Sequence, residues 1–179
     1  MALAEAPWGH TRMKMMTENG KLSLRNPLDL MEEIVSANEW LFDRSSRDEL
    51  AIEVQGRWSD YRIFAVWQNE IGALQFSCQL ELKVPPMRRA PVCELVAELN
   101  GRLWLGHFDL GPEMVMPTFR HTLLLRGASG ASAEQLEDLV EFAIAECERF
   151  YPAFQFVIWG GKSAGEAVSA AILDTVGAA

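Results

Sequence analysis

The chain has 179 residues, about the size of one domain, and its 49% hydrophobic and 23% charged residues are typical of a folded globular protein. Its 16 basic and 25 acidic residues give a formal net charge of −9, which argues against nucleic acid as a partner because a phosphate backbone would be repelled. No stretch approaches the roughly 20 consecutive apolar residues of a membrane span, so we expect no membrane insertion.

The first 24 residues combine Gly, Pro, Met, Lys and Glu without a lasting period, which predicts a flexible tail over residues 1–24 and a single domain over residues 25–179. This N-terminus lacks the basic start and apolar block of an export signal, so we expect a cytoplasmic protein. The three cysteines all lie in apolar periodic segments, which predicts buried free thiols at Cys78, Cys93 and Cys147.

A first helix is predicted to begin after Asn26. Asn is a favourable N-cap, Pro27 suits the first helical position, and Asp29 places a carboxylate in the first turn. The segment that follows has the i, i+3, i+4, i+7 spacing of an amphipathic helix, with one stripe formed by Leu28, Met31, Ile34, Val35 and Asn38.

Three strands are expected next. Residues 50–54 alternate between apolar and polar side chains, which predicts the first strand. Residues 61–67 are aromatic and β-branched with few charges, so we expect a central strand that is buried on much of both faces. Residues 74–84 alternate most regularly, and Pro85 and Pro86 end that strand because proline cannot donate a backbone hydrogen bond.

A second helix is predicted to begin near Met87 or Pro91 and to end at Gly101. Its apolar stripe must face either the sheet or a second protomer, and it consists of Val92, Leu95, Val96, Leu99 and Leu103. Two more strands, over residues 103–110 and 119–126, are expected to form a hairpin with a long loop.

The C-terminal part is predicted to be helical. Ser132 and Gln135 have the spacing of a capping box, and the helix that they begin is acidic outside its apolar stripe. Pro152 interrupts this pattern, so residues 153–159 could form a separate helix or a strand, of which we favour a short helix beginning at Pro152. A final Ala-rich helix follows Ser163. The elements together predict an α+β fold in which an antiparallel sheet of about five strands packs with helices in the order α-β-β-β-α-β-β-α, with a C-terminal helical extension.

No motif predicts a catalytic residue, a metal site or a cofactor. The GGKS sequence at residues 160–163 resembles the end of a phosphate-binding loop, but Phe156 occupies the position where that loop has its first glycine. We interpret it as the end of one helix and the start of the next. The cysteines have no C-x-x-C spacing, and no serine lies in a G-x-S-x-G turn.

Two sets of residues are candidates for a binding site. Trp58 and Trp104 lie next to arginines and are expected at an edge or groove, since tryptophan is enriched at the energetic centres of protein interfaces. The second set is the densest polar group in the expected hairpin and consists of His107, Asp109, Arg120 and His121.

The order of elements and several sequence stretches resemble the YbjN family, whose members are described as sensory transduction regulators with a type III secretion chaperone-like fold. The resemblance spans about residues 26–175 and is most specific in LNGRLWLGHFDL, ending at Leu110, and in the Arg120–His121 pair. It implies the predicted arrangement of helices and strands, a homodimer and no catalytic residues.

Two functions are therefore open. The first is a non-catalytic, dimeric protein-binding module, chaperone-like or regulatory, whose protein partner the sequence does not identify. Its candidate contacts are Trp58, Trp104, His107, Asp109, Arg120 and His121. The alternative is a small-molecule sensor or enzyme with a polar pocket around His107, Asp109, Arg120 and His121.

Overall fold

The structure is a computed structural model that describes residues 25–176, so the tail expected over residues 1–24 lies outside the described residues. The described part contains one antiparallel sheet with the strand order β1-β2-β3-β4-β6-β5. The strands are β1 (Leu41–Ser46), β2 (Glu49–Gln55), β3 (Asp60–Gln68), β4 (Ala73–Leu80), β5 (His107–Asp109) and β6 (Thr118–Leu124). The helices are α1 (Pro27–Ala37), the 3-10 turn η1 (Pro86–Arg88), α2 (Arg89–Asn100), α3 (Ala133–Ile158) and α4 (Ala164–Val176). The predicted α+β fold is confirmed.

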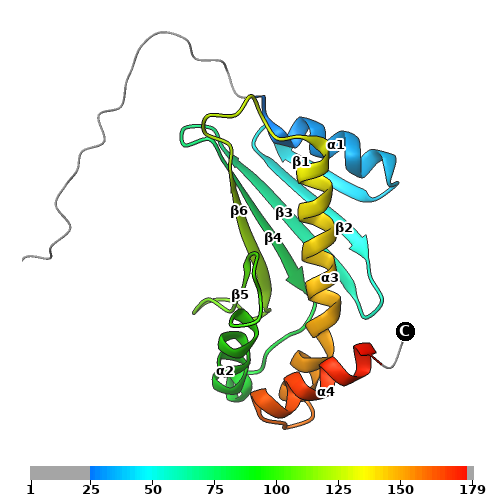
Figure 1. Ribbon diagram of the computed structural model, residues 1–179, viewed down its shortest axis with the longest axis vertical. Helices are drawn as coiled ribbons and strands as arrows, with labels where there is room; N and C mark the ends of the chain where they lie inside the picture. The colour runs from blue at the N-terminus through cyan, green and yellow to red at the C-terminus, as the bar shows by residue number, and fades with distance from the viewer. Residues whose placement is uncertain (1–24, 177–179) are drawn as a thin grey trace, which may run out of the picture.

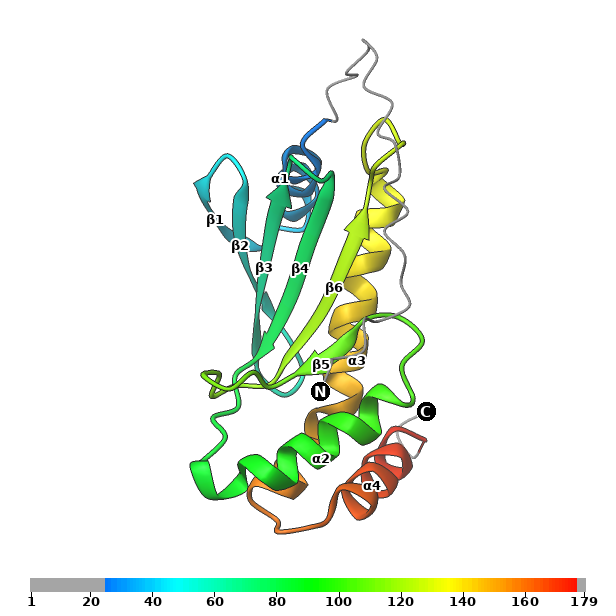
Figure 2. The ribbon, with the colours of Figure 1, turned by 90° about the vertical axis from the view of Figure 1, so that its left-hand side faces the viewer.

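The helices leave one face of the sheet open. α1 packs against β1, β2 and β3, and α3 crosses β4 on the same side (Figure 1). Figure 2, turned by 90° from Figure 1, views the sheet from the side away from these helices, so that α1 and α3 lie behind the strands. The strand side chains that point toward these helices form the core together with the apolar stripes of α1 and α3. The face that points away from them is called the open face below.

The start of α1 is fixed to the sheet by its predicted N-cap. The Asn26 side-chain oxygen accepts a hydrogen bond from the Leu28 N–H at 3.0 Å, as the sequence predicts for an N-cap. Its amide nitrogen donates to the Arg47 carbonyl at 2.9 Å. One nearly buried side chain therefore joins the helix to the turn between β1 and β2.

Strand β1 is absent from the sequence prediction, so the sheet has six strands instead of about five. All its residues except Arg44 are exposed, so it carries no apolar alternation that a sequence pattern could show. Its place is set by tertiary contacts, because the Arg44 guanidinium forms ion pairs with Asp29 and Glu32 of α1 at 3.1 Å each.

The prediction that β3 is buried on much of both faces is wrong. Tyr61, Ile63 and Trp67 are buried, whereas Arg62 and Phe64 are exposed, because the open face has no covering layer. The prediction for Cys93 is also wrong, since this residue is exposed on α2, while Cys78 and Cys147 are buried as expected and all three are free thiols.

The remaining differences concern boundaries. The strand predicted over residues 74–84 ends at Leu80, beyond which the Val84 N–H bonds to the Val115 carbonyl of a loop. The strand predicted over 103–110 is only three residues long. Helix α3 continues through Pro152 without interruption, so residues 153–158 are helical but do not begin a new helix. Burial of Phe154 and Val157 in the core offsets the backbone hydrogen bond that the proline removes.

The apolar stripe of α2 is covered within the chain, in part by helix α4. The stripe residues Val92, Leu95 and Leu99 are buried within the chain, because α2 packs against α3, α4 and β5. This surface is therefore not available to a second protomer.

The turn between β2 and β3 closes onto α3 at Gly56. The Arg57 N–H donates to Glu148 Oε1 at 2.6 Å, and the Trp58 ring stacks on Tyr151 with a centroid separation of 6.3 Å. A Cβ atom at Gly56 would overlap the Tyr61 ring and Glu148 Oε1. Only glycine lets the turn approach the helix this closely.

We expect Gly56→Ala to lower the free energy of unfolding by about 1–3 kcal/mol, because the added methyl group must displace a buried ring. Urea denaturation measures this change. Gly101→Ala is the matched control, since a Cβ there has its nearest neighbour at 3.5 Å and the residue has a φ of −66°. Its effect should stay within about 0.5 kcal/mol. Equal effects of the two substitutions would contradict the close approach at Gly56.

Candidate functional site

The structure brings three of the predicted polar residues together on the open face. The pairing of β5 with β6 places His107 opposite Arg120 and Asp109 opposite Thr118. Arg120 Nε lies 3.1 Å from Asp109 Oδ2, and both side chains are partly exposed. The three residues form a solvated charged group at the β5 edge of the sheet.

His121 lies on the other face. Successive side chains of a strand alternate, and His121 pairs with Phe76, whose side chain is buried on the helix side. Partial burial lowers the pKa of His121 below its ordinary value, and the nearby His107 lowers this pKa further. The sheet separates His121 from Asp109 and Arg120, so the four side chains do not line a single pocket.

The two candidate tryptophans lie far apart. Trp58 stacks on Tyr151, whereas Trp104 is 83% exposed and packs edge-on against Phe142 at 5.4 Å. Phe142 and Tyr151 are separated by about two and a half turns of α3, which places them on opposite sides of the helix. The two tryptophans therefore do not form one groove.

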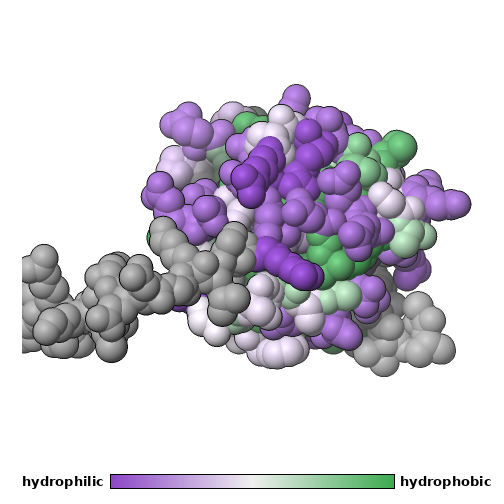
Figure 3. Space-filling model, turned by 90° about the horizontal axis from the view of Figure 1, so that it is seen from above, coloured by the Kyte–Doolittle hydropathy of each residue, from purple (hydrophilic) through white to green (hydrophobic). Residues whose placement is uncertain are grey.

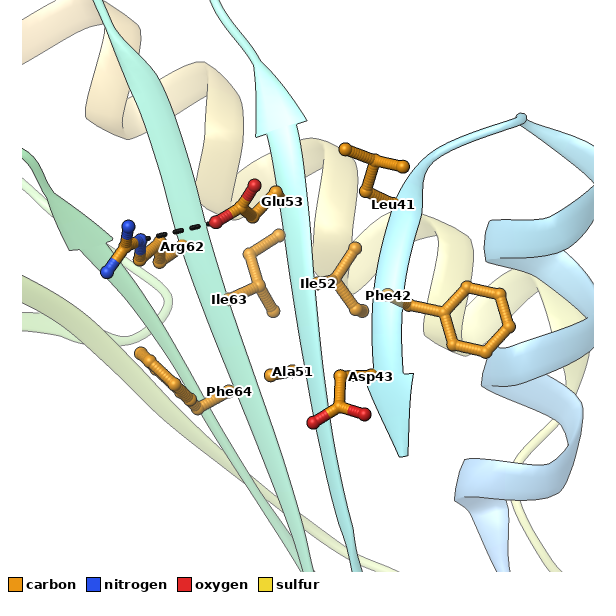
Figure 4. A pocket seen from close by; sticks show the side chains of 9 residues that line it. All are labelled: Leu41, Phe42, Asp43, Ala51, Ile52, Glu53, Arg62, Ile63 and Phe64. Atoms are coloured by element: carbon orange, nitrogen blue, oxygen red, sulfur yellow. Dashed lines mark ion pairs between the residues drawn. The ribbon is translucent and has the colours of Figure 1, made fainter. Parts of the chain in front are cut away.

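A hollow of about 390 Å³ lies on the open face at the β1 edge (Figure 4). Two exposed apolar side chains beside it point to the open face: Leu41 is 73% exposed and Phe64 is 41% exposed, whereas Phe42 pairs with the buried Ile52 and points to the helix side. The other residues that line it are Phe42, Asp43, Ala51, Ile52, Glu53, Arg62 and Ile63. Large exposed apolar side chains beside a concavity are typical of protein-binding surfaces.

Strand register joins this hollow to the charged group at the other edge. Residues that are directly opposite in paired strands share a face of the sheet. One row of such partners crosses the open face from β1 to β5 and consists of Asp43, Ala51, Phe64, Ser77, Arg120 and His107. Phe64 and Arg120 are two strands apart, a distance of about 10 Å. The hollow and the predicted polar residues thus belong to one continuous surface.

Charges around the hollow are mostly negative. Arg62 Nε lies 3.5 Å from Glu53 Oε1, and the dashed line in Figure 4 marks this ion pair. Asp43 has no ion-pair partner among the described residues. A different part of the surface, the end of the molecule that is seen from above in Figure 3, is mainly hydrophilic with smaller hydrophobic areas. The open face therefore combines apolar contacts with an acidic rim.

Two features of the described residues concern metal binding and thiol chemistry. No group of three His, Cys, Asp or Glu side chains in this part of the chain could hold a metal ion. Burial raises the pKa of the Cys147 thiol well above its ordinary value, which keeps the thiol protonated. The helices between residues 25 and 176 are also too short or too polar to cross a membrane.

Sequence reasoning missed the residues around the hollow. Leu41 and Phe42 are adjacent apolar residues in a polar segment, so neither the 3.6-residue period of a helix nor the two-residue period of a strand indicated an element there. Phe64 lies in a predicted strand, but only the sheet shows that its side chain points to solvent. The available signal was the pair of large apolar residues just before Asp43 and Arg44.

Comparisons with known proteins identify a family for this chain. The sequence matches the model of the YbjN family, "Putative bacterial sensory transduction regulator", over residues 27–156, from α1 through most of α3. It is similar to the solved structure "Crystal structure of YbjN, a putative transcription regulator from E. coli", with 14% sequence identity, a TM-score of 0.47, and coverage of 73% of this chain and 87% of that chain. A comparison with curated proteins found no match.

We expect His121 to titrate below pH 6.5 in a proton NMR titration, with the signal assigned through a His121→Gln variant. His107→Gln should raise this pKa toward its ordinary value because it removes a neighbouring positive charge. In the original chain, the unfolded state binds a proton at His121 more readily than the folded state does. The stability that neutral His121 contributes is therefore lost as the pH falls through about 6.5. His121→Gln should therefore lose less thermal stability than the original chain between pH 7 and pH 5. A His121 pKa at or above 6.5 would contradict the placement of this side chain.

Proposed function

Because this chain belongs to the YbjN family, we propose that it is a cytoplasmic, non-catalytic module of a regulatory system that binds another protein on the open face of its sheet. The observation that carries this proposal is the exposure of Leu41 and Phe64 beside the 390 Å³ hollow. No helix of the described residues covers this face.

The energetics of these side chains support a binding role. Burial of apolar surface contributes about 25 cal/mol per Å², and an aromatic side chain in a well-packed site can contribute 2 kcal/mol or more to an interface. In the free protein, Leu41 and Phe64 leave much of this stabilisation unused. A partner that covers them would gain it without any rearrangement of the core.

The predicted polar residues fit this proposal in different ways. His107, Asp109 and Arg120 lie on the open face, where they can form a polar rim around an apolar centre. Trp58, Trp104 and His121 lie elsewhere, so a role for them in partner binding requires a second contact area. The proposed homodimer must also use a surface other than the stripe of α2.

The alternative function, a sensor or enzyme with a polar pocket, has less support. Its four residues are divided between the two faces of the sheet, so their side chains do not line a shared cavity. The hollow at the β1 edge is a different site, and its centre is apolar.

A photo-crosslinking experiment tests the proposed function. With p-benzoylphenylalanine in place of Phe64, crosslinking in the native cell should give a discrete adduct that mass spectrometry identifies. The same probe in place of Glu141, which is exposed on α3, should not give this adduct. For the identified partner, Phe64→Ser should weaken binding about 30-fold, equivalent to about 2 kcal/mol. The absence of any adduct specific to position 64 would overturn the proposal.

A further inference from the structure

We infer that the partner binds as an extended, basic segment that adds a strand to the free edge of β1. The inference rests on the proposed function and specifies the chemistry of the partner. It follows from three features of the molecule: an open sheet edge, an adjacent hollow for side chains, and an excess of carboxylates around both.

The edge is the first feature. β1 is the outermost strand of the sheet, and no element of the described residues lies beyond it (Figure 2). An edge strand has backbone N–H and C=O groups along one side that no neighbouring strand pairs. The other edge strand, β5, has only three residues and offers few such groups.

Arg44 holds this edge in place and limits its accessible length. Its ion pairs with Asp29 and Glu32 fix β1 to α1 in the free protein, so strand addition would not have to order the edge first. The same guanidinium donates hydrogen bonds to the carbonyls of Ser46 and Arg47. The stretch left for a new strand is therefore residues 41–45.

The hollow is the second feature. In a strand added beside β1, every second side chain would point to the open face, beside Leu41 and Asp43. The hollow lies directly inward from these two residues, toward Phe64. An apolar side chain of the added segment could thus contact Leu41, while its backbone pairs with β1.

Charge is the third feature, and it selects the occupant. The open face of β1, β2 and β3 carries one cation, Arg62, and four carboxylates, which belong to Asp43, Glu49, Glu53 and Asp60. A segment whose open-face residues, at every second position, are in turn apolar and basic would complement this surface, because Leu41 and the carboxylates lie on the same face. A second copy of this chain would not, because pairing β1 with itself brings two acidic faces together, and the only cation of β1 is engaged by α1.

Peptide probes test this inference on the full chain. The probe is a ten-residue peptide of the repeat Val-Thr-Lys-Thr, capped at both ends, which places valine and lysine in turn along one face of a strand. The controls are the same peptide with glutamate for lysine and a version interrupted by prolines, which cannot add as a strand. The lysine peptide should bind at least tenfold more tightly than either control. In hydrogen–deuterium exchange, it should protect amides within residues 41–45.

Charge variants separate this binding from general attraction to an acidic protein. Asp43→Lys should weaken binding of the lysine peptide roughly fivefold and strengthen that of the glutamate peptide, because the charge at the edge is reversed. Asp138→Lys is the matched control, since it makes the same change of net charge at an exposed position of α3 and should leave both affinities nearly unchanged. Asp43→Asn should give a smaller change in the same direction as Asp43→Lys, and it serves as the second variant if the lysine substitution impairs folding.

The outcomes distinguish this inference from the proposed function. Equal effects of Asp43→Lys and Asp138→Lys, no protection of residues 41–45, or a dimer that protects these residues without peptide would each overturn strand addition. If one of these results accompanied a specific adduct at position 64, the open face would still bind a protein, but not as a strand at β1. If position 64 gave no specific adduct, the proposed function itself would be wrong.

Discussion

The fold depends on one constraint, which is that the strands of a single sheet must bury one face under α1 and α3. Alternate side chains of β2, β3 and β4 point to this side and are almost fully buried there, as is Phe119 of β6. α1 covers β1, β2 and β3, and α3 covers β4 with an apolar stripe that continues without a break past Pro152. The helix tolerates this proline because the neighbouring side chains are buried in the core, and their packing offsets the backbone hydrogen bond that the proline removes.

The same constraint produces the candidate functional surface. If alternate residues of each strand must point to the helices, the residues between them must point away, and no second layer in the described residues covers them. Most of these positions are polar, as solvent requires. Leu41, Phe64 and Leu124 are exposed and apolar, and of these Leu41 and Phe64 lie around the same hollow at the edge that Arg44 fixes. An apolar group at this place in an otherwise solvated face is better explained by binding than by folding.

The proposals for function share this physical basis. A module that leaves a rigid edge and an apolar hollow exposed can bind an extended segment without refolding, and its acidic rim would disfavour acidic partners. Neither feature requires reactive side chains. The turn at Gly56 supports the arrangement from the other end of β2 and β3, because it ties these strands to α3 through Glu148 and Trp58.

The sequence by itself determined the elements that have a strong local signal. The cap at Asn26, the capping box at Ser132 and the alternation in β4 each reflect interactions within a few residues, and the structure contains them where they were predicted. Apart from the predicted hairpin of β5 and β6, the tertiary structure alone decided which strands are neighbours, which face is covered and where β1 lies. Register placed Arg120 in one row with Phe64 and put His121 on the opposite face, and it depends on contacts between residues far apart in the chain. Local periodicity carries no information about such contacts, so the edge and the hollow could not be read from the sequence.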